Sequence, residues 1–133
     1  MKNILFILLF ILPIVGYSQE NSKKDPKSER IYTSVDINPE FPGGEEEFYK
    51  YLSKNIKYPK KDRRKGITGR VFLTFVVTDV GGIRDARVLR GVSKAIDEEA
   101  LRVINSMPKW KPGTQNGTAV NVQFNIPINF TLK

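Results

Sequence analysis

The sequence lacks the two residue types on which most enzyme active sites and zinc centres depend. None of its 133 residues is histidine or cysteine. Histidine is the commonest general base, and both residues are the usual ligands of zinc. The composition therefore excludes the Ser-His-Asp and Cys-His catalytic arrangements and the common zinc sites. It also excludes a disulfide framework.

Carboxylates are the remaining candidates for catalysis. Asp79 and Asp85 flank a predicted hairpin turn, and residues 97–99 form an acidic cluster in a predicted helix. Charges at turns and near helix starts are ordinary features of solvated surfaces, and this interpretation is favoured. The glycine pairs at 43–44 and 81–82 lack the strand-loop-helix spacing of a phosphate-binding loop. We therefore predict a protein that is not an enzyme and that uses no cofactor or metal.

The chain is basic, with a formal net charge of +8. Between Lys57 and Lys65 six cations surround one acidic residue, Asp62. Positive charge of this size favours acidic partners and anionic surfaces. Two interpretations stay open for this run: a solvated loop, or a surface that binds anionic cell-wall polymer or lipid. Nucleic acid is not expected as a partner, because the N-terminus indicates export.

An apolar run from Ile4 to Gly16 opens the chain. It is shorter than the ~20 residues of a membrane-spanning helix but matches the ~7–15 apolar residues of a secretory signal. Gly16 and Ser18 are small and precede a cut before Gln19. We predict a signal peptide over residues 1–18 and export to the periplasm. An uncleaved anchor in the inner membrane is the alternative.

Residues 19–40 are predicted to form a flexible tether, with a short strand or extended arm over Ile31–Ile37. Residues 41–133 then form one α+β domain. Apolar residues at helical spacing predict two helices, one over Glu45–Asn55 and one that begins after Ser93 as N-cap and ends before Pro108. Trp110, together with Phe75 and Phe124, is predicted to anchor the core.

Three strands are predicted. Gly69–Asp79 is apolar on both faces, which indicates a central strand. Ile83–Arg90 returns beside it as a hairpin. Val120–Leu132 alternates apolar and polar residues, and Pro127, on the polar phase, indicates an edge strand because proline donates no ladder hydrogen bond. A right-handed crossover gives the order 2-1-3, so we predict a three-stranded sheet with two helices and the C-terminal strand at an edge.

Six motifs in fixed order carry a family resemblance: FPGG, NIKYP, GITGRVFLTFVV, IDEEALRVI, MPKWKPG and VNVQFNIPINF. Together they resemble the TonB C-terminal domain family, in its energy-transducer form, from about Ile31 to Lys133. The resemblance implies a periplasmic domain that grips a short segment, the TonB box, of an outer-membrane TonB-dependent receptor. That segment adds as a strand beside the last strand of the domain, near a Tyr-Pro motif that corresponds here to Tyr58-Pro59.

The predicted partner-binding residues follow from both lines of reasoning. Tyr58 and Pro59 come from the resemblance, although a packed ring and a helix stop would also explain them. Asn121, Gln123 and Asn125 lie on the outward phase of the predicted edge strand, where they would present its backbone to an extended segment. The chain departs from complete TonB proteins in having no histidine-bearing membrane span and no long proline-rich spacer. We therefore expect a recognition domain without the motor-coupling segment.

Overall fold

A computed structural model of the protein describes residues 29–132, so the predicted signal peptide lies outside the described residues. In this part of the chain, no helix is long and apolar enough to cross a membrane. The helices and strands are β1 (Ile31–Tyr32), α2 (Glu45–Asn55), α3 (Lys60–Arg64), β2 (Gly69–Val77), β3 (Ile83–Arg90), α4 (Lys94–Asn105), β4 (Gly113–Gln115) and β5 (Thr118–Phe130).

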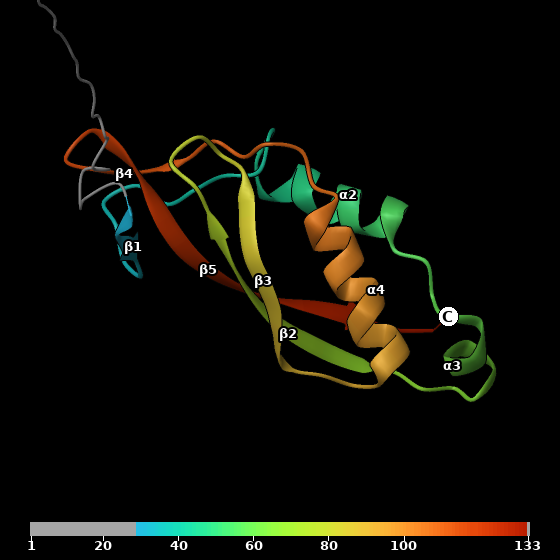
Figure 1. The fold of residues 1–133 in the computed structure, drawn as a ribbon. Helices are drawn as coiled ribbons and strands as arrows, with labels where there is room; N and C mark the ends of the chain where they lie inside the picture. Colours follow the sequence, from blue (N-terminus) through green and yellow to red (C-terminus); the bar gives the residue numbers. More distant parts are fainter. Residues whose placement is uncertain (1–28, 133) are drawn as a thin grey trace, which may run out of the picture.

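The sheet has the order β1-β5-β2-β3, with β4 paired to β5 (Figure 1). The three predicted strands lie in the order β5-β2-β3, with β2 in the middle. The prediction of a three-stranded sheet is wrong, because β1 pairs parallel to β5 at Asn121 and Val122, and β4 pairs with β5 at Thr118–Val120. Strands of two and three residues are too short to show a periodicity in the sequence.

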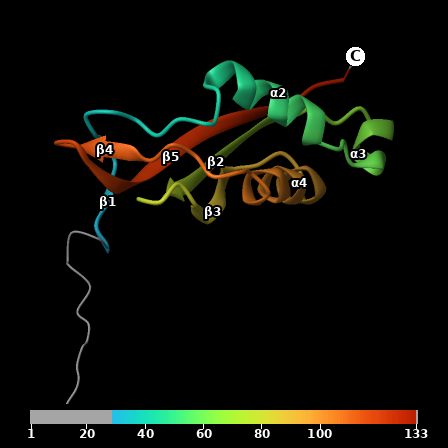
Figure 2. The same ribbon diagram turned by 90° about the horizontal axis from the view of Figure 1, so that it is seen from above.

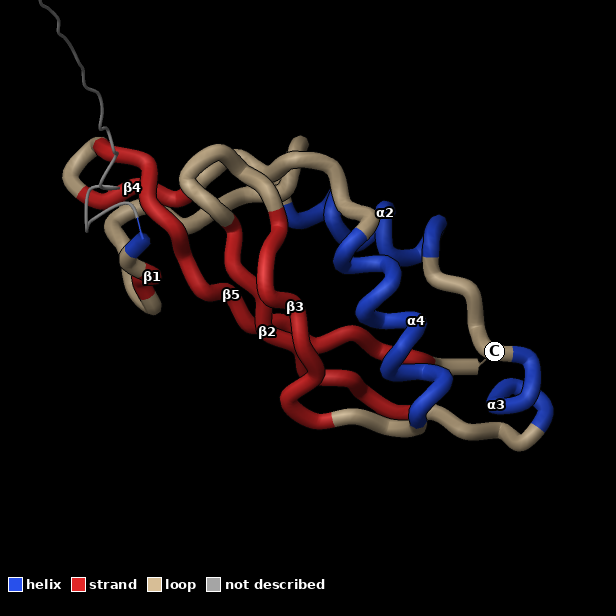
Figure 3. Tube along the Cα trace, viewed as in Figure 1, coloured by secondary structure: helices blue, strands red, loops and turns tan. Residues whose placement is uncertain are grey.

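One face of the sheet carries the core. Alternate residues of β2 and β5 meet the apolar stripes of α2 and α4 there, in one cluster of buried side chains. The largest fully buried members are Phe75, Phe130, Leu73, Ile96 and Ile104. Figure 3 shows β5 as the longest strand, running from the β4 end of the domain toward its C-terminus. Within this core α4 packs over β3 and β2, whereas α2 lies beside β5 (Figure 2).

The two predicted helices are confirmed, and their ends show why they form. Ser93 is the N-cap of α4, and its hydroxyl accepts a hydrogen bond from the Ile96 N–H at 3.2 Å. Glu45, Glu46 and Glu47 occupy the first turn of α2, where the helix dipole favours negative charge. Both N-termini thus have the chemistry that stabilises a helix start.

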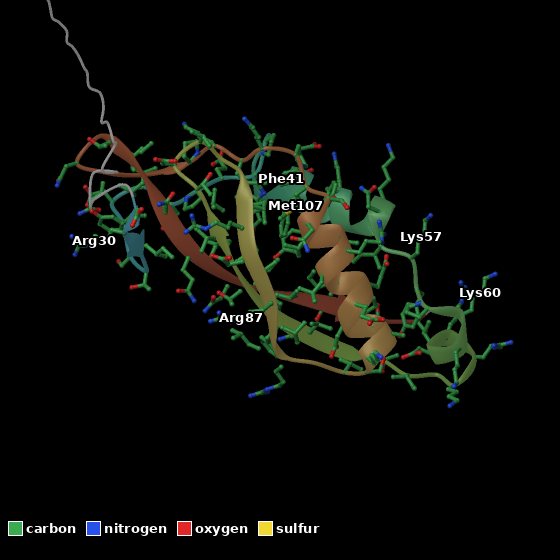
Figure 4. All side chains as sticks on the ribbon, viewed as in Figure 1. Arg30, Phe41, Lys57, Lys60, Arg87 and Met107 are labelled. Carbon is green, nitrogen blue, oxygen red and sulfur yellow. The ribbon has the colours of Figure 1, made fainter. Side chains whose placement is uncertain are left out.

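The solvated loop predicted over residues 60–65 is wrong, because this segment forms α3. Asp62 is buried, and its carboxylate accepts a hydrogen bond from the Ser93 hydroxyl. This contact spans 31 residues of sequence, so no local sequence pattern predicts it. The neighbouring cations stay exposed, and Lys57 and Lys60 point away from the body of the domain (Figure 4).

Candidate functional site

The backbone direction along β5 follows from one hydrogen bond in the β2–β3 turn. The Thr78 N–H donates to the Gly82 carbonyl at 2.8 Å, so even-numbered residues at this end of β2 direct their backbone toward β3. Odd-numbered residues of β2 then face β5, since the direction alternates along a strand. The β2–β5 register is continuous and pairs Val77 with Val122 and Phe75 with Phe124.

Even-numbered residues of β5 therefore bond to β2, and odd-numbered residues direct their N–H and C=O groups outward. This outward set contains Pro127, whose missing N–H leaves no gap in the β2–β5 ladder. Gln123, Asn125 and Asn129 share its phase. From Gln123 to Phe130 no other strand of the described chain covers this side of β5. We call this stretch the open edge.

Asn121 differs from the prediction, because it lies beneath β1 rather than on the open edge. It is only 4% exposed. Its Oδ1 accepts a hydrogen bond from the Asp79 N–H at 2.8 Å, and its Nδ2 donates to the Arg30 carbonyl at 3.4 Å. Asn121 thus fastens the N-terminal arm and the β2–β3 turn to β5. It marks the point at which the open edge begins.

Gln123 and Asn125 do lie on the open edge. The Gln123 side chain is half-buried, and its Nε2 donates to the Thr74 hydroxyl at 3.0 Å on the sheet face away from the helices. The Asn125 side chain is exposed. Both backbones face outward, and the partner-binding role of these residues stays a prediction.

Three cavities follow the open edge, and Figure 2 shows α2 running alongside this part of β5. The arm cavity, of about 280 Å³, lies between Gln123–Asn125 and the arm residues Thr33 and Asn38. The aromatic cavity, of about 410 Å³, lies between Phe124–Pro127 and the start of α2. The tyrosine cavity, of about 490 Å³, lies between Pro127–Thr131 and the end of α2.

Tyr49 and Pro127 line both the aromatic and the tyrosine cavities. The Tyr49 side chain belongs to α2 and is 54% exposed, although it is a large apolar ring. An exposed ring between two cavities beside an unpaired strand is a favourable contact for a bound chain. Together the cavities form one groove, which we call the edge groove.

Trp110 forms the floor of the aromatic cavity. It is 5% exposed, so the prediction of a core anchor is confirmed. Its indole lies 5.5–5.7 Å from the rings of four phenylalanines, Phe41, Phe48, Phe75 and Phe124. Its Nε1–H meets no hydrogen-bond acceptor among the described residues. Phe124 is only partly buried, because it also lines the cavity.

The β2–β3 turn holds the Trp110 backbone in place. The Trp110 N–H donates to the Gly81 carbonyl at 2.9 Å. Gly81 has φ +86°, and a Cβ atom there would lie 2.1 Å from the Trp110 carbonyl oxygen. Only glycine permits this approach.

Tyr58 and Pro59 lie at the far end of the edge groove. The Tyr58 ring packs edge-on against Phe130 at 5.7 Å, and its hydroxyl donates to the Ile67 carbonyl. Pro59 is the N-cap of α3. The packed-ring explanation thus fits both residues, and Tyr58 in addition lines the tyrosine cavity. Gln123 and Phe130 are seven residue steps apart along β5, or ~23 Å of strand.

A pair of charged residues on α4 fixes the end of α2 beside the tyrosine cavity. The Glu99 carboxylate accepts hydrogen bonds from the Arg102 guanidinium at 2.7 Å and from the Lys57 N–H at 2.6 Å, and Arg102 also donates to the Asn55 carbonyl. The hydrogen bond from Arg102 lowers the pKa of Glu99, despite an opposing contribution from burial. The same hydrogen bond raises the pKa of Arg102.

Sequence reasoning missed several residues of the groove. Asn129 continues the outward phase of β5 and could have been found from the same alternation. Glu40, Glu45 and Tyr49 could not, because they reach the groove through tertiary packing. No group of three His, Cys, Asp or Glu side chains in the described part of the chain could hold a metal ion.

Comparisons with known proteins agree with this geometry. The family model described as "Gram-negative bacterial TonB protein C-terminal" matches residues 54–132. Two solution NMR structures of the Helicobacter pylori TonB C-terminal domain are similar, each with a TM-score of 0.51. One is 26% identical and covers 69% of this chain and 87% of its own; the other is 25% identical and covers 66% and 92%. A search of curated proteins gives no match.

Proposed function

Because the chain belongs to the Gram-negative bacterial TonB C-terminal family and is thus a module of TonB-type envelope transport, we propose that its open edge binds an extended segment of an outer-membrane receptor. The segment adds to β5 as a further strand, in the periplasm. The domain acts in this proposal as an interaction module and not as an enzyme.

The observation that carries the proposal is the backbone of β5. Three N–H groups, of Gln123, Asn125 and Asn129, and the carbonyls of the same phase face outward along the regular part of the strand. In β-augmentation these groups supply the affinity, and pockets for alternate side chains supply the selectivity. The edge groove has both features. β1, parallel on the same side of β5, supports the proposal because it pairs with that edge in the manner expected of a partner.

The length of the edge sets the length of the segment. A strand laid from Gln123 to Phe130 matches eight residues of β5, because paired strands have nearly equal rise. At one end β1 limits the edge, and at the other end Tyr58 packs on Phe130. We therefore expect the bound part of the receptor segment to be about eight residues long.

Gln123→Pro tests the proposal with the protein otherwise intact. Proline removes an N–H that faces outward, so the domain should stay folded, as it does with Pro127 on the same phase. Binding of fluorescent peptides copied from the N-terminal segments of the organism's own outer-membrane receptors should be lost. Gln123→Ala keeps the N–H and should change affinity only modestly.

Circular dichroism and a thermal melt establish that each variant is folded. A folded Gln123→Pro protein that binds the receptor peptides like the parent would overturn β-augmentation at this strand.

A further inference from the structure

The aromatic cavity differs in charge from the rest of the molecule. Among residues 29–132, the only charged ones that line it are Glu40 and Glu45, although the chain as a whole carries +8. Both residues are exposed at the cavity mouth. Neither takes part in an ion pair with another described residue. The aromatic cavity is thus lined by aromatic rings and by two carboxylates that form no ion pair with another described residue.

This combination has a defined chemistry. A cation over an aromatic face is stabilised by the ring quadrupole. Long basic side chains lay their methylene groups on apolar surface and keep the charged end in water. The cavity offers an apolar wall of Phe48, Tyr49 and Ile126 for the methylenes, and carboxylates at the rim for the charge.

We propose that the aromatic cavity binds a lysine or arginine side chain of the segment added to β5. The inference rests on the proposed function, since it requires a strand on the open edge. Side chains of such a strand alternate between the two sheet faces, and directly opposed residues of paired strands lie on the same face. The residue opposite Ile126 therefore enters the space between β5 and α2, where the cavity lies.

The charge of the neighbouring tyrosine cavity limits the register in which the segment can bind. Of the residues that the structure describes, Arg70 is the only charged one that lines the tyrosine cavity, and its Nε donates to the Asn129 Oδ1 at 2.8 Å. The groove is thus acidic toward the start of α2 and basic toward its end. A basic residue favours the first position and disfavours the second, so charge selects one register of the bound segment.

The probes are acetylated, amidated octapeptides of alternating valine and serine in which one central valine is replaced by lysine, norleucine or glutamate. Norleucine has the length of lysine without the charge. The lysine peptide should bind roughly three- to tenfold more tightly than the norleucine peptide, and the glutamate peptide more weakly than both. Raising the salt concentration should narrow these differences.

The double variant Glu40→Gln, Glu45→Gln should abolish the preference for lysine. The matched control is Glu46→Gln, Glu47→Gln, which also removes two negative charges. Both residues lie next to Glu45 in the first turn of α2 but outside the cavity, where they face Lys50. This control should keep the preference.

The outcomes separate the two proposals. If the three peptides bind the parent equally and Gln123→Pro abolishes all binding, the cation site is overturned and the edge proposal stands. If the preference for lysine persists in the Glu40, Glu45 variant, the assignment to this cavity is wrong. If no peptide binds, or if Gln123→Pro changes nothing, the proposed function fails together with the cation site.

Discussion

The two strands that flank β2, β3 and β5, differ in the regularity of their pairing and in the charge of their side chains. Both β3 and β5 have one side without a long partner strand among the described residues. β5 pairs with β2 in unbroken register from Phe130 to Val122, and its outward-phase side chains on the open edge are neutral. β3 pairs with β2 in a register that shifts twice, and it carries three arginines.

The two shifts in β3 place its arginines on one face. Residues three apart lie on opposite faces of a regular strand. Here Arg84, Arg87 and Arg90 pair with the alternate β2 residues Val76, Thr74 and Phe72, because each shift adds one residue to β3. One extra residue is Asp85, whose φ is +55°. The row lies on the sheet face away from the helices, and Arg90 stacks on Phe72 at 5.2 Å; Figure 4 labels Arg87 beside β3.

Bulges, charged side chains and proline are features by which natural sheets limit pairing of an exposed edge. β3 has bulges and charges, whereas the open edge of β5 has Pro127 alone. The difference indicates that the domain blocks one edge and leaves the other available, which supports a specific role for β5. Unprotected backbone of this length would otherwise favour aggregation.

The largest expected effect is the difference in stability between two proline variants of β5, Phe124→Pro and Gln123→Pro. Phe124→Pro removes an N–H that bonds to β2 and leaves a buried partner unsatisfied, at a cost of about 1–3 kcal/mol. Loss of the partly buried ring adds to it, by less than the about 3–5 kcal/mol of a fully buried aromatic. Phe124→Pro should therefore be unfolded by circular dichroism, whereas Gln123→Pro should stay folded. Phe124→Ala isolates the loss of the ring. Equal folding of the two proline variants would reverse the assigned backbone direction.

Trp110→Ala should cause the second-largest loss of stability, because the Trp110 ring packs beneath the open edge against Phe124. Truncation of a buried aromatic costs about 3–5 kcal/mol, a large part of the ~5–15 kcal/mol that stabilises a domain. The melting temperature should fall sharply. Leu89→Ala, at an apolar residue of β3 that is 54% exposed, should change stability by less than about 0.5 kcal/mol. A Trp110→Ala protein that melts like the parent but binds no peptide would make Trp110 a contact residue.

Removal of the charges from β3 should alter association more than stability. The triple variant Arg84→Thr, Arg87→Thr, Arg90→Thr keeps β propensity and removes the like charges that oppose pairing. Sedimentation velocity should show more self-association than in the parent, while peptide binding at β5 stays the same. An unchanged sedimentation profile would mean that the bulges alone protect this edge.

The sequence predicted the parts of the fold in which long periodic segments bury one face. β2 and β5 have nine and thirteen residues, and their patterns placed the central strand and the outward phase of Pro127 correctly. The N-cap Ser93 was also predictable, because capping depends on residues three apart. The regular framework of the domain is thus encoded in local patterns.

Features that depend on distant contacts were not predictable. Asn121 is buried by Arg30 and β1, and the hydrogen bond to the Arg30 carbonyl spans 91 residues of sequence. α3 depends on Asp62 reaching Ser93. The carboxylates of the aromatic cavity come from the arm and from α2, and only the tertiary fold brings them to Trp110. These contacts determine where the edge opens and what its groove accepts.

The smallest expected effect concerns the Glu99–Arg102 pair, which holds the end of α2 through hydrogen bonds with the Lys57 N–H and the Asn55 carbonyl. The pKa of Glu99 is lower in the folded protein than the ordinary value of about 4.3, mainly because Arg102 donates to the carboxylate. A lowered folded pKa stabilises the protein above the unfolded pKa, and this stabilisation is lost as the pH falls through the folded value. The melting temperature of Glu99→Gln should therefore lie slightly below that of the parent at pH 7, and the gap should close below about pH 4. Glu98→Gln, at an exposed neighbour outside the ion pairs of the described chain, should show no such gap. A difference between Glu99→Gln and the parent that is the same at pH 3 and pH 7 would show that the ionised carboxylate does not hold the end of α2.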